Sequence, residues 1–377
     1  MQEALRFVAQ RYSPRKVGDL RKAALGLGHD MLLLGIETSC DETAAAVVKD
    51  GRQVLSNIVA SQDRLHLPYG GVVPEIACRA HLTTLLPVIR RALEEAEVRV
   101  EDLDGVAVTH TPGLVGALLI GLTAAKTLAW LRDRPIIGVN HLHAHAYAAA
   151  LEREAPLFPC VSLVASGGHT SLFRSRSPIE HETLGATLDD AAGEAFDKAA
   201  NILGLGYPGG PSVDRAARAG NPRAIAFPRT RLGPDSLDFS FSGIKTAVLY
   251  HCRGQNARTP RPPLTGQETA DVAASFQEAV VDTLVEKLLE AARRLGAGRI
   301  AVGGGVAANS RLRERLADAA RRRRLEVVLP PIRYCADNAA MVAGIAYPLY
   351  TAGRVSDLTL DACPTERRDK HAEARQG

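Results

Sequence analysis

A chain of 377 residues is long enough for two or three domains, because a single domain usually holds about 100–200 residues. Hydrophobic residues make up 46% of the chain and charged residues 23%, a composition typical of folded proteins that excludes disorder over most of its length. The formal net charge is +4, but residues 1–30 hold six basic and three acidic residues, which leaves 40 basic and 39 acidic residues in the remainder. Because the charges nearly balance, the net charge gives no reason to expect nucleic-acid binding.

The cysteines and the two ends of the chain favour a reduced, cytoplasmic setting. The six cysteines are far apart in sequence and include no CxxC pair, and the N-terminus lacks the long apolar run of a secretory signal. We expect residues 1–30 to be a disordered extension or a mis-assigned start ahead of Met31, with an organelle-targeting leader as the alternative. Residues 365–377 are expected to form a charged tail.

The most apolar stretch, residues 114–131, is predicted to be a buried helix. Glycine, threonine and lysine residues interrupt it, whereas a membrane span needs about 20 apolar residues. No membrane anchor is therefore expected.

The first half of the chain alternates strand and helix patterns. Residues 31–37 and 44–48 are apolar runs on either side of a polar turn at 38–42, which predicts a strand, a turn and a strand. After them we expect a helix, a strand and a second helix over residues 81–96, 105–109 and 112–130.

The second half opens in the same way. Residues 161–165 and 171–173 are apolar runs around a Gly-bearing turn. This repetition predicts two related halves, each opening with a hairpin whose tip is polar. Helices are also expected over 191–203, 267–295 and 310–324, with a strand at 299–302 and an Arg- and Pro-rich loop at 252–266.

A histidine cluster is the first candidate for chemistry. On a helix, His141 and His145 are one turn apart on the same face, which is the spacing that two imidazoles need to bind one metal ion, while His143 points elsewhere. The metalloprotease pattern HExxH is missing, because Leu142 stands where that motif has glutamate. The alternative interpretation is a set of surface or capping histidines.

Two glycine-rich turns are candidate nucleotide sites. Residues 301–310 predict a strand that ends in three glycines and opens a helix with Asn309 near its start, where a phosphate or a ribose hydroxyl is favoured. The turn 166–170, at the tip of the second hairpin, leaves backbone N–H groups to bind an anion. Either segment could instead be an ordinary tight turn.

Carboxylates mark the matching turn of the first half. Glu37, Asp41 and Glu42 would repel phosphate, which favours a metal or proton-transfer role, although solvated turn charges are the alternative for Glu37 and Glu42. Asp337 precedes a small-residue helix and is either a site carboxylate or the N-cap of that helix. The four arginines at 321–324 are expected to be a solvated helix end, with a phosphate-contacting patch as the alternative.

Eight segments, in this order, resemble the motifs of one known family. They are GIETSCDETAAAVV, PGLVGALLIGLTAAKTLA, SGGHT, DDAAGEAFDKAA, GYPGGPSVD, DFSFSGIKTA, GGGVAANSRLR and YCADNAAM. The resemblance covers residues 31–363 and is to the TsaD family, which has archaeal and eukaryotic relatives in the KEOPS complex.

The resemblance implies an α/β protein with the actin-like, sugar-kinase-like ATPase fold, in which two RNase H-like lobes have a nucleotide cleft between them. The N-terminal lobe is then expected over residues 31–140, with 347–364 packing back on it, and the C-terminal lobe over 141–346. Members of the family transfer a threonylcarbamoyl group from threonylcarbamoyl-adenylate to the exocyclic amine of the adenosine beside the anticodon, in tRNAs that read codons beginning with A. The resemblance therefore implies a metal-dependent acyltransferase.

Matching the motifs residue by residue assigns roles to individual side chains. The resemblance implies that His141, His145 and Asp337 are the ligands of one divalent metal ion, with iron favoured over zinc. His143 is an alternative ligand, because the family often has an acidic or small residue at that position. Asp41 is expected to accept a proton, assisted by His169. The residues expected to hold the adenylate, or ATP or ADP in its place, are Val164, Ala165, Ser166, Gly167, Gly168, Asp197, Gly210, Asp214 and Asn309.

The implied partners are tRNA, threonylcarbamoyl-AMP and either a TsaB-like paralogue with a TsaE-like ATPase or a second copy of the chain. The alternative functions are a small-molecule kinase of the same fold, a non-catalytic scaffold paralogue and a metallopeptidase. Kinases of this fold bind magnesium mainly through carboxylates and phosphates, whereas the ligands expected here include two histidines. A peptidase would need a glutamate within the histidine motif.

Overall fold

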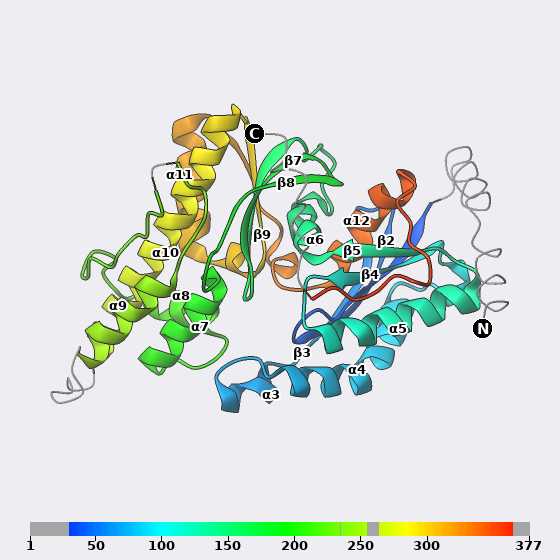
Figure 1. Ribbon diagram of the computed structural model, residues 1–377, viewed down its shortest axis with the longest axis horizontal. Coiled ribbons are helices and arrows are strands. Elements are labelled where there is room, and N and C mark those ends of the chain that lie inside the picture. Colours follow the sequence, from blue (N-terminus) through cyan, green and yellow to red (C-terminus); the bar gives the residue numbers. More distant parts are fainter. Residues whose placement is uncertain (1–29, 234, 255–263, 365–377) are drawn as a thin grey trace. The chain divides into compact units, whose positions relative to one another are not determined.

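The computed structural model describes residues 30–233, 235–254 and 264–364, which form two compact units (Figure 1). The first unit holds residues 30–60, 74–141 and 342–364, and the second holds 61–73 and the described part of 142–341. The expected extension before Met31, apart from Asp30, and the charged tail lie outside the described residues. Most of the loop predicted at 252–266 also lies outside them.

The first unit is built on a five-stranded sheet in the order β3-β2-β1-β4-β5. β1 runs antiparallel to β2 and parallel to β4, and β4 runs parallel to β5. The strands are β1 (Leu32–Glu37), β2 (Glu42–Lys49), β3 (Gln53–Ser61), β4 (Gly105–Thr111) and β5 (Ile136–Asn140). The strands predicted at 31–37, 44–48 and 105–109 are therefore confirmed.

The second unit contains a sheet of the same pattern, in the order β10-β9-β6-β7-β8. Its strands are β6 (Cys160–Ala165), β7 (Thr170–Ser177), β8 (Glu180–Ala186), β9 (Arg299–Gly303) and β10 (Glu326–Val328). β6 runs antiparallel to β7 and parallel to β9, and β9 runs parallel to β10. In both sheets an opening hairpin is extended on one side by two parallel strands, which confirms the predicted duplication.

Each hairpin is followed by a third strand that the sequence pattern does not predict. β3 and β8 are the outermost strands on the hairpin side of their sheets. Their side chains are mostly exposed or half-buried, so they lack the apolar alternation by which half-buried strands are recognised.

Helices cover both faces of the first sheet. α4 (Pro74–Glu95) and α5 (Val115–Arg132) lie side by side on one face, and most of α12 (Ala339–Thr351) lies on the other (Figure 1). Alternate residues of the strands, among them Ile36 of β1 and Val108 of β4, pack into the core beneath α4 and α5. A short 3-10 turn, η2 (Val100–Asp102), leads from α4 to β4.

Of the described residues, α5 is the one helix that is long and apolar enough to cross a membrane by length and composition alone. Leu122, Ala125 and Ala129 of this helix are buried in the core of the first unit. The structure thus places α5 as a core helix, as predicted for residues 112–130. The helix begins three residues later than predicted because Pro112 and Gly113 belong to the preceding turn.

The second unit carries most of the remaining helices. In chain order its helices and 3-10 turns are α3 (Asp63–His66), η1 (Leu67–Tyr69), α6 (His141–Tyr147), η3 (Ala148–Ala150), α7 (Ala192–Leu203), α8 (Gly209–Ala217), α9 (Ser242–Arg253), α10 (Gly266–Leu295), η4 (Gly305–Ala308), α11 (Ser310–Arg323) and η5 (Ile332–Tyr334). The predicted helices at 191–203, 267–295 and 310–324 are confirmed. α6 starts at the last residue of the first unit's range and continues into the second.

The central strand β6 is buried on both faces. Leu163 and Ala165 point into the main core of the unit, which α7 and α10 also line, while Val164 points the other way. Val164 packs with Leu142 and Ala146 of α6. Because successive side chains of a strand alternate, a strand covered on both sides has a continuous apolar sequence, as β6 does.

Two predicted boundaries differ from the structure for identifiable reasons. α4 begins at Pro74 rather than at residue 81, since proline is well suited to the first turn of a helix, where its missing N–H breaks no helical bond. α9 continues through Arg253, so the first two residues of the predicted loop are helical. At the other end, the hydroxyl of Thr265 accepts the backbone N–H of Glu268 and caps α10.

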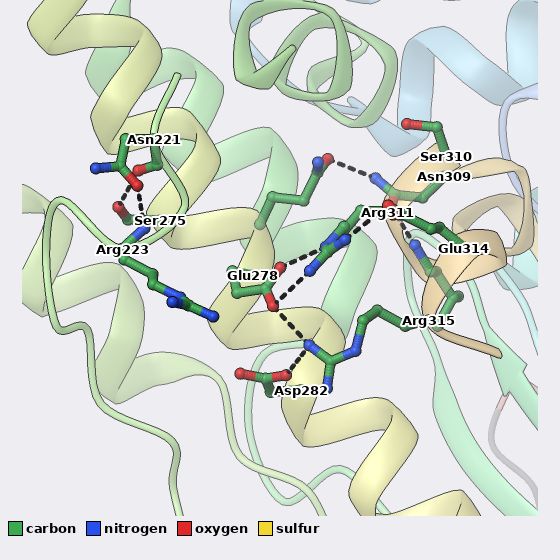
Figure 2. A network of polar contacts seen from close by, with 12 residues as sticks. Asn221, Arg223, Ser275, Glu278, Asp282, Asn309, Ser310, Arg311, Glu314 and Arg315 are labelled. Carbon is green, nitrogen blue, oxygen red and sulfur yellow. Dashed lines mark hydrogen bonds and ion pairs between the residues drawn. The ribbon is translucent and has the colours of Figure 1, made fainter. Parts of the chain in front are cut away.

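Charged side chains join α10 to α11 (Figure 2). Arg311 donates two hydrogen bonds to Glu278, at 2.6 and 2.9 Å, and Arg315 donates another at 2.5 Å while also pairing with Asp282. Burial alone would raise the pKa of Glu278, but the hydrogen bonds and positive charge of the two arginines outweigh it and hold that pKa below its usual value. The Glu278 carboxylate therefore remains charged and fixes α11 against α10.

Replacing this carboxylate with an amide (Glu278→Gln) is expected to lower the free energy of unfolding at pH 7 by about 1–3 kcal/mol, because charge-assisted hydrogen bonds are lost. Since the pKa of Glu278 is lowered by folding from 4.5, the stabilisation is present above that value and is lost as the pH falls through the folded-state pKa. Urea unfolding of both proteins between pH 7 and pH 3 should show a difference that is steady above about pH 5 and narrows below pH 4.5. A difference that stays constant over this range would contradict the assignment.

Candidate active site and metal centre

The short helix α6 carries both histidines of the predicted metal site. His141 and His145 are separated by one helical turn, and both are buried. His145 Nε2 lies 3.0 Å from Oδ1 of Asp337. One ligand atom from each of His141, His145 and Asp337 lies within 4.8 Å of the other two. The three predicted ligands thus form a local group around α6.

The structure separates the two roles considered for Asp337. The side-chain oxygen of Asn338 accepts the backbone N–H of Met341 at 3.0 Å and caps the start of α12. The neighbouring asparagine therefore supplies a cap to this helix. The carboxylate of Asp337 lies against His145, as expected for a site carboxylate.

A buried carboxylate lies behind His141. Oε2 of Glu37 is 3.0 Å from Nδ1 of His141 and accepts the hydroxyl of Thr109 at 2.6 Å, while Oε1 accepts the backbone N–H of Ser39 at 2.6 Å. A carboxylate at Nδ1 keeps the proton on that nitrogen and leaves the lone pair of the ring on Nε2. Glu37 is fully buried, so the interpretation of this residue as a solvated turn charge is wrong.

His143 packs away from this group, as the helical spacing predicts. Its ring stacks on that of His181 at 4.4 Å and meets Phe173 edge-on at 5.8 Å. Burial, together with the neighbouring His181, lowers the pKa of His143 to about 3. His143 is therefore a neutral side chain packed beside the predicted ligands.

The donor set suits a divalent metal ion. Two imidazoles and one carboxylate are nitrogen and oxygen ligands that both iron and zinc accept, and the same combination is common at non-haem iron sites. The Glu37 carboxylate behind His141 is the kind of outer hydrogen bond that orients a metal-binding imidazole. The chemistry of the group thus agrees with a metal centre.

The turn after β6 is closed on one side and open on the other. The backbone N–H of Ser166 donates to the carbonyl of His169 at 2.8 Å, and the N–H of His169 donates to the Ser166 hydroxyl at 3.3 Å. Gly167 and Gly168 form the exposed tip, where an added Cβ would have no atom within 4 Å. The tip therefore has room for a ligand against its backbone.

Two glycines bring the end of β9 close to β6 and α6. Gly303 pairs with Val164 in the parallel register, and a Cβ on Gly303 would lie 2.1 Å from the carbonyl oxygen of His145. A Cβ on Gly304 would lie 2.3 Å from the carbonyl oxygen of Ala165, and its φ of +87° is one that other residues rarely adopt. Neither position has space for a side chain.

Three hydrogen bonds connect the second hairpin turn, α7, α8 and α11 in sequence. They join the N–H of Gly193 to the carbonyl of Ser166 (3.1 Å), the N–H of Gly209 to Oδ1 of Asp197 (2.7 Å) and the hydroxyl of Ser310 to Oδ1 of Asp214 (2.6 Å). Gly210 follows Gly209 in the first turn of α8. The predicted adenylate residues are thus linked to one another within the second unit.

Asn309 occupies the N-cap position of α11, next to Ser310 (Figure 2). Its Oδ1 accepts the backbone N–H of Leu312 at 3.0 Å, and its Nδ2 donates to Oε1 of Gln277 at 2.7 Å. The sequence offers no signal for Gln277, because it lies within a long amphipathic helix.

Asp41 and His169 lie at the tips of the two hairpins, each in its own unit. Asp41 is buried in the turn between β1 and β2. From α4, the buried His81 donates through Nε2 to the carbonyl of Cys40 at 2.9 Å and accepts the hydroxyl of Thr43 at Nδ1, at 2.7 Å. His81 thus supports the Asp41 turn on both sides, a role that the sequence analysis missed.

Comparison with known proteins identifies relatives over most of the chain. The model of the family described as TsaD: tRNA N6-adenosine threonylcarbamoyltransferase matches residues 53–344. A protein of that name from Symbiobacterium thermophilum is 56% identical over 334 residues, which is 88% of this chain and 96% of the relative. The proteins of that name from Sorangium cellulosum and Geobacter sulfurreducens are each 51% identical, over 92% of this chain and 99% and 100% of their own lengths.

Solved structures share the fold at low sequence identity. Full-length HypF, in a phosphate- and nucleotide-bound form, matches 88% of this chain and 48% of its own with a TM-score of 0.56 and 14% identity. HypF from T. kodakarensis matches 89% of this chain and 49% of its own with the same TM-score and 15% identity. Together with the two repeated sheets, this likeness confirms the predicted α/β, actin-like fold.

Placing a methyl group at the close approach of β9 to α6 (Gly303→Ala) is expected to destabilise the second unit by about 1–3 kcal/mol, because the Cβ meets the backbone oxygen of His145. Gly305→Ala is the matched control, since its Cβ would meet no atom within 4 Å. Urea unfolding of the two variants checks the difference. Equal stability of both variants would contradict the close approach.

Proposed function

Because the chain belongs to the TsaD family of tRNA N6-adenosine threonylcarbamoyltransferases, we propose that it transfers a threonylcarbamoyl group from threonylcarbamoyl-AMP to the adenosine beside the anticodon, in tRNAs that read codons beginning with A. The observation that carries the proposal is the His141, His145 and Asp337 group. Both histidines belong to α6, which packs on Val164 of β6 and brings the His145 carbonyl against Gly303 of β9, at the strands that lead into the two turns expected to hold the adenylate.

The reaction replaces one bond to the threonylcarbamoyl carbon with another. The exocyclic N6 of adenosine attacks the carbonyl carbon, the new C–N bond forms, the C–O bond to the phosphate breaks, and AMP leaves with the electron pair. The amine loses one proton, which we assign to the carboxylate of Asp41 with assistance from His169. Since the donor is already activated and the adenine amine is a poor nucleophile, the protein mainly orients the two substrates and accepts the proton.

The metal ion would be held by His141, His145 and Asp337, and iron is our assignment because two histidines and one carboxylate are a common donor set for non-haem iron. When bound, such an ion polarises a substrate oxygen as a Lewis acid. Glu37 supports the site by holding the His141 ring with its proton on Nδ1.

The adenylate would lie against the second hairpin turn and the start of α11. The open backbone of Gly167 and Gly168 and the N-terminal end of α11 both suit a phosphate. Asp197 and Asp214 are acceptors, which suit the hydroxyl and amino donors of a nucleoside. ATP or ADP would use the same residues.

The other functions considered have less support. Relatives about 50% identical over most of the chain are named as threonylcarbamoyltransferases, which favours this function over a small-molecule kinase. Retention of both histidines and Asp337 in one group favours an enzyme over a non-catalytic scaffold. Leu142 occupies the place of the glutamate that a HExxH peptidase would need.

The substrate tRNA and a protein partner complete the proposal. The exposed arginines at 321–324, which end α11, are candidate contacts for tRNA phosphates. Exposed apolar side chains of α4 and α5 support a TsaB-like paralogue or a second copy of the chain as partner, with a TsaE-like ATPase in the former case; they are Leu82, Leu86, Val115 and Leu119.

The cytoplasm is the proposed location, where unmodified tRNA is available. The cysteines support it, because none of the six, all of which are among the described residues, forms a disulfide.

A reconstituted reaction tests the function directly. The purified chain is incubated with threonylcarbamoyl-AMP and unmodified tRNA, with and without the two candidate partner proteins, and the nucleosides of the tRNA are analysed by mass spectrometry. We expect threonylcarbamoyladenosine to form, and its yield to fall on substituting Asp41→Ala. Hydrolysis of a peptide, or ATP-dependent phosphorylation of a small molecule without modified tRNA, would contradict the proposal.

The contact between Glu37 and His141 leads to a separate prediction. Glu37→Gln is expected to weaken metal binding by about 10–100-fold, because the amide holds the imidazole less firmly with its proton on Nδ1. Competition titrations with Fe(II) and Zn(II) measure the affinity, and Glu75→Gln makes the same chemical change at an exposed carboxylate in the first turn of α4 as a control. Metal affinity that is unchanged in Glu37→Gln would exclude this role.

A further inference from the structure

We propose that Gln277 of α10 is a positioning residue for the adenylate, because it fixes the orientation of the Asn309 carboxamide. This inference rests on the proposed function and deepens it, since Asn309 is one of the residues assigned to the adenylate. Gln277 itself is buried in the second unit, at 6% exposure.

The two ends of the Asn309 side chain are distinguished by its neighbours. The backbone N–H of Leu312 can only donate, so the amide group must present Oδ1 to it, at 3.0 Å. Nδ2 then faces Oε1 of Gln277 at 2.7 Å. The helix cap thus decides which end of the amide is the oxygen, and Gln277 provides the acceptor for the other end.

The start of α11, where Asn309 lies, is also held by other contacts with α10. The next residue, Glu278, binds Arg311 and Arg315 of α11 (Figure 2). Those ion pairs fix the backbone of the first turns of α11, whereas the hydrogen bond from Asn309 to Gln277 fixes the rotation of one side chain. The adjacent residues of α10 therefore have separable functions, one in stability and the other in orientation.

The chemistry of the amide explains why its orientation matters to the ligand. An NH2 group carries two hydrogens, and one of those on Nδ2 is directed at Gln277. The second is the donor that we assign to an oxygen of the adenylate. Without the acceptor on Gln277, the only hydrogen bond holding the amide would be the one to Leu312, and the donor to the ligand would be less well oriented.

Three substitutions at this position separate acceptor chemistry from packing. Gln277→Met has a similar size but offers no oxygen acceptor, Gln277→Glu keeps an acceptor oxygen at the same reach, and Gln277→Asn withdraws the acceptor by one methylene group. Calorimetry with AMP measures binding, and the transfer reaction gives KM and kcat for threonylcarbamoyl-AMP. Thermal unfolding is followed in parallel, and if Gln277→Met does not fold, Gln277→Asn is compared with Gln277→Glu in its place.

We expect Gln277→Met to raise both the Kd for AMP and the KM for threonylcarbamoyl-AMP by about five- to tenfold, as the loss of one buried hydrogen bond does, with kcat changed less than about twofold. Gln277→Glu should restore both values to within about twofold of the wild type. Wild-type AMP affinity in Gln277→Met, or equal weakening in Gln277→Met and Gln277→Glu, would overturn the inference. The expected pattern of AMP binding in a chain that modifies no tRNA would support Gln277 as a positioning residue and contradict the proposed function.

Discussion

The close packing of β9 against α6 and β6 depends on two neighbouring glycines, Gly303 and Gly304, which have no side chains. At the end of β9, the backbone of Gly303 lies against the carbonyl of His145 on α6. The backbone of Gly304 lies against the carbonyl of Ala165 at the end of β6. The helix with the two histidines proposed to bind the metal and the turn proposed to bind the nucleotide therefore lie against the same short segment of backbone. Interiors are packed densely enough that even one methyl group at such a position would force the elements apart. The apolar sequence of β6 serves the same purpose, since α6 covers one of its faces and the main core covers the other.

Buried hydrogen bonds then fix the individual side chains. Glu37 accepts three hydrogen bonds at full burial, one of them from His141, so its charge is well solvated by the protein. The Asn309 amide is held at both ends. Such supporting contacts leave little rotational freedom to lose when a ligand binds, which is the physical basis of a preorganised site. Among the exposed arginines at 321–324, Arg321 pairs instead with Asp318 on the surface of its own helix.

The sequence allows the main elements to be predicted wherever burial leaves a periodic pattern. The hairpins, the long amphipathic α10 and the spacing of His141 and His145 are local features, and the structure contains them. β3 and β8 escape prediction because their side chains are only partly buried. The contacts between site residues cannot be predicted for another reason. Glu37 and His141 are far apart in the chain, as are Gln277 and Asn309. A local sequence pattern carries no information about a contact that only the fold creates. Asp337 shows the remaining difficulty, since a carboxylate and an asparagine side by side are equally good N-caps by type, and tertiary packing decides that Asn338 caps the helix.

The proposed function requires the His141, His145 and Asp337 group to bind a metal ion that serves the acyl transfer. The most direct test is to remove all metal from the purified chain, return Fe(II) in measured amounts, and follow threonylcarbamoyladenosine formation in tRNA at each step. Activity should be lost with the metal and should return in proportion to bound iron, reaching its maximum at about one ion per chain, as expected for a single group of three ligands. Full transfer activity in the metal-free chain would contradict a role in the reaction for a metal ion held by His141, His145 and Asp337.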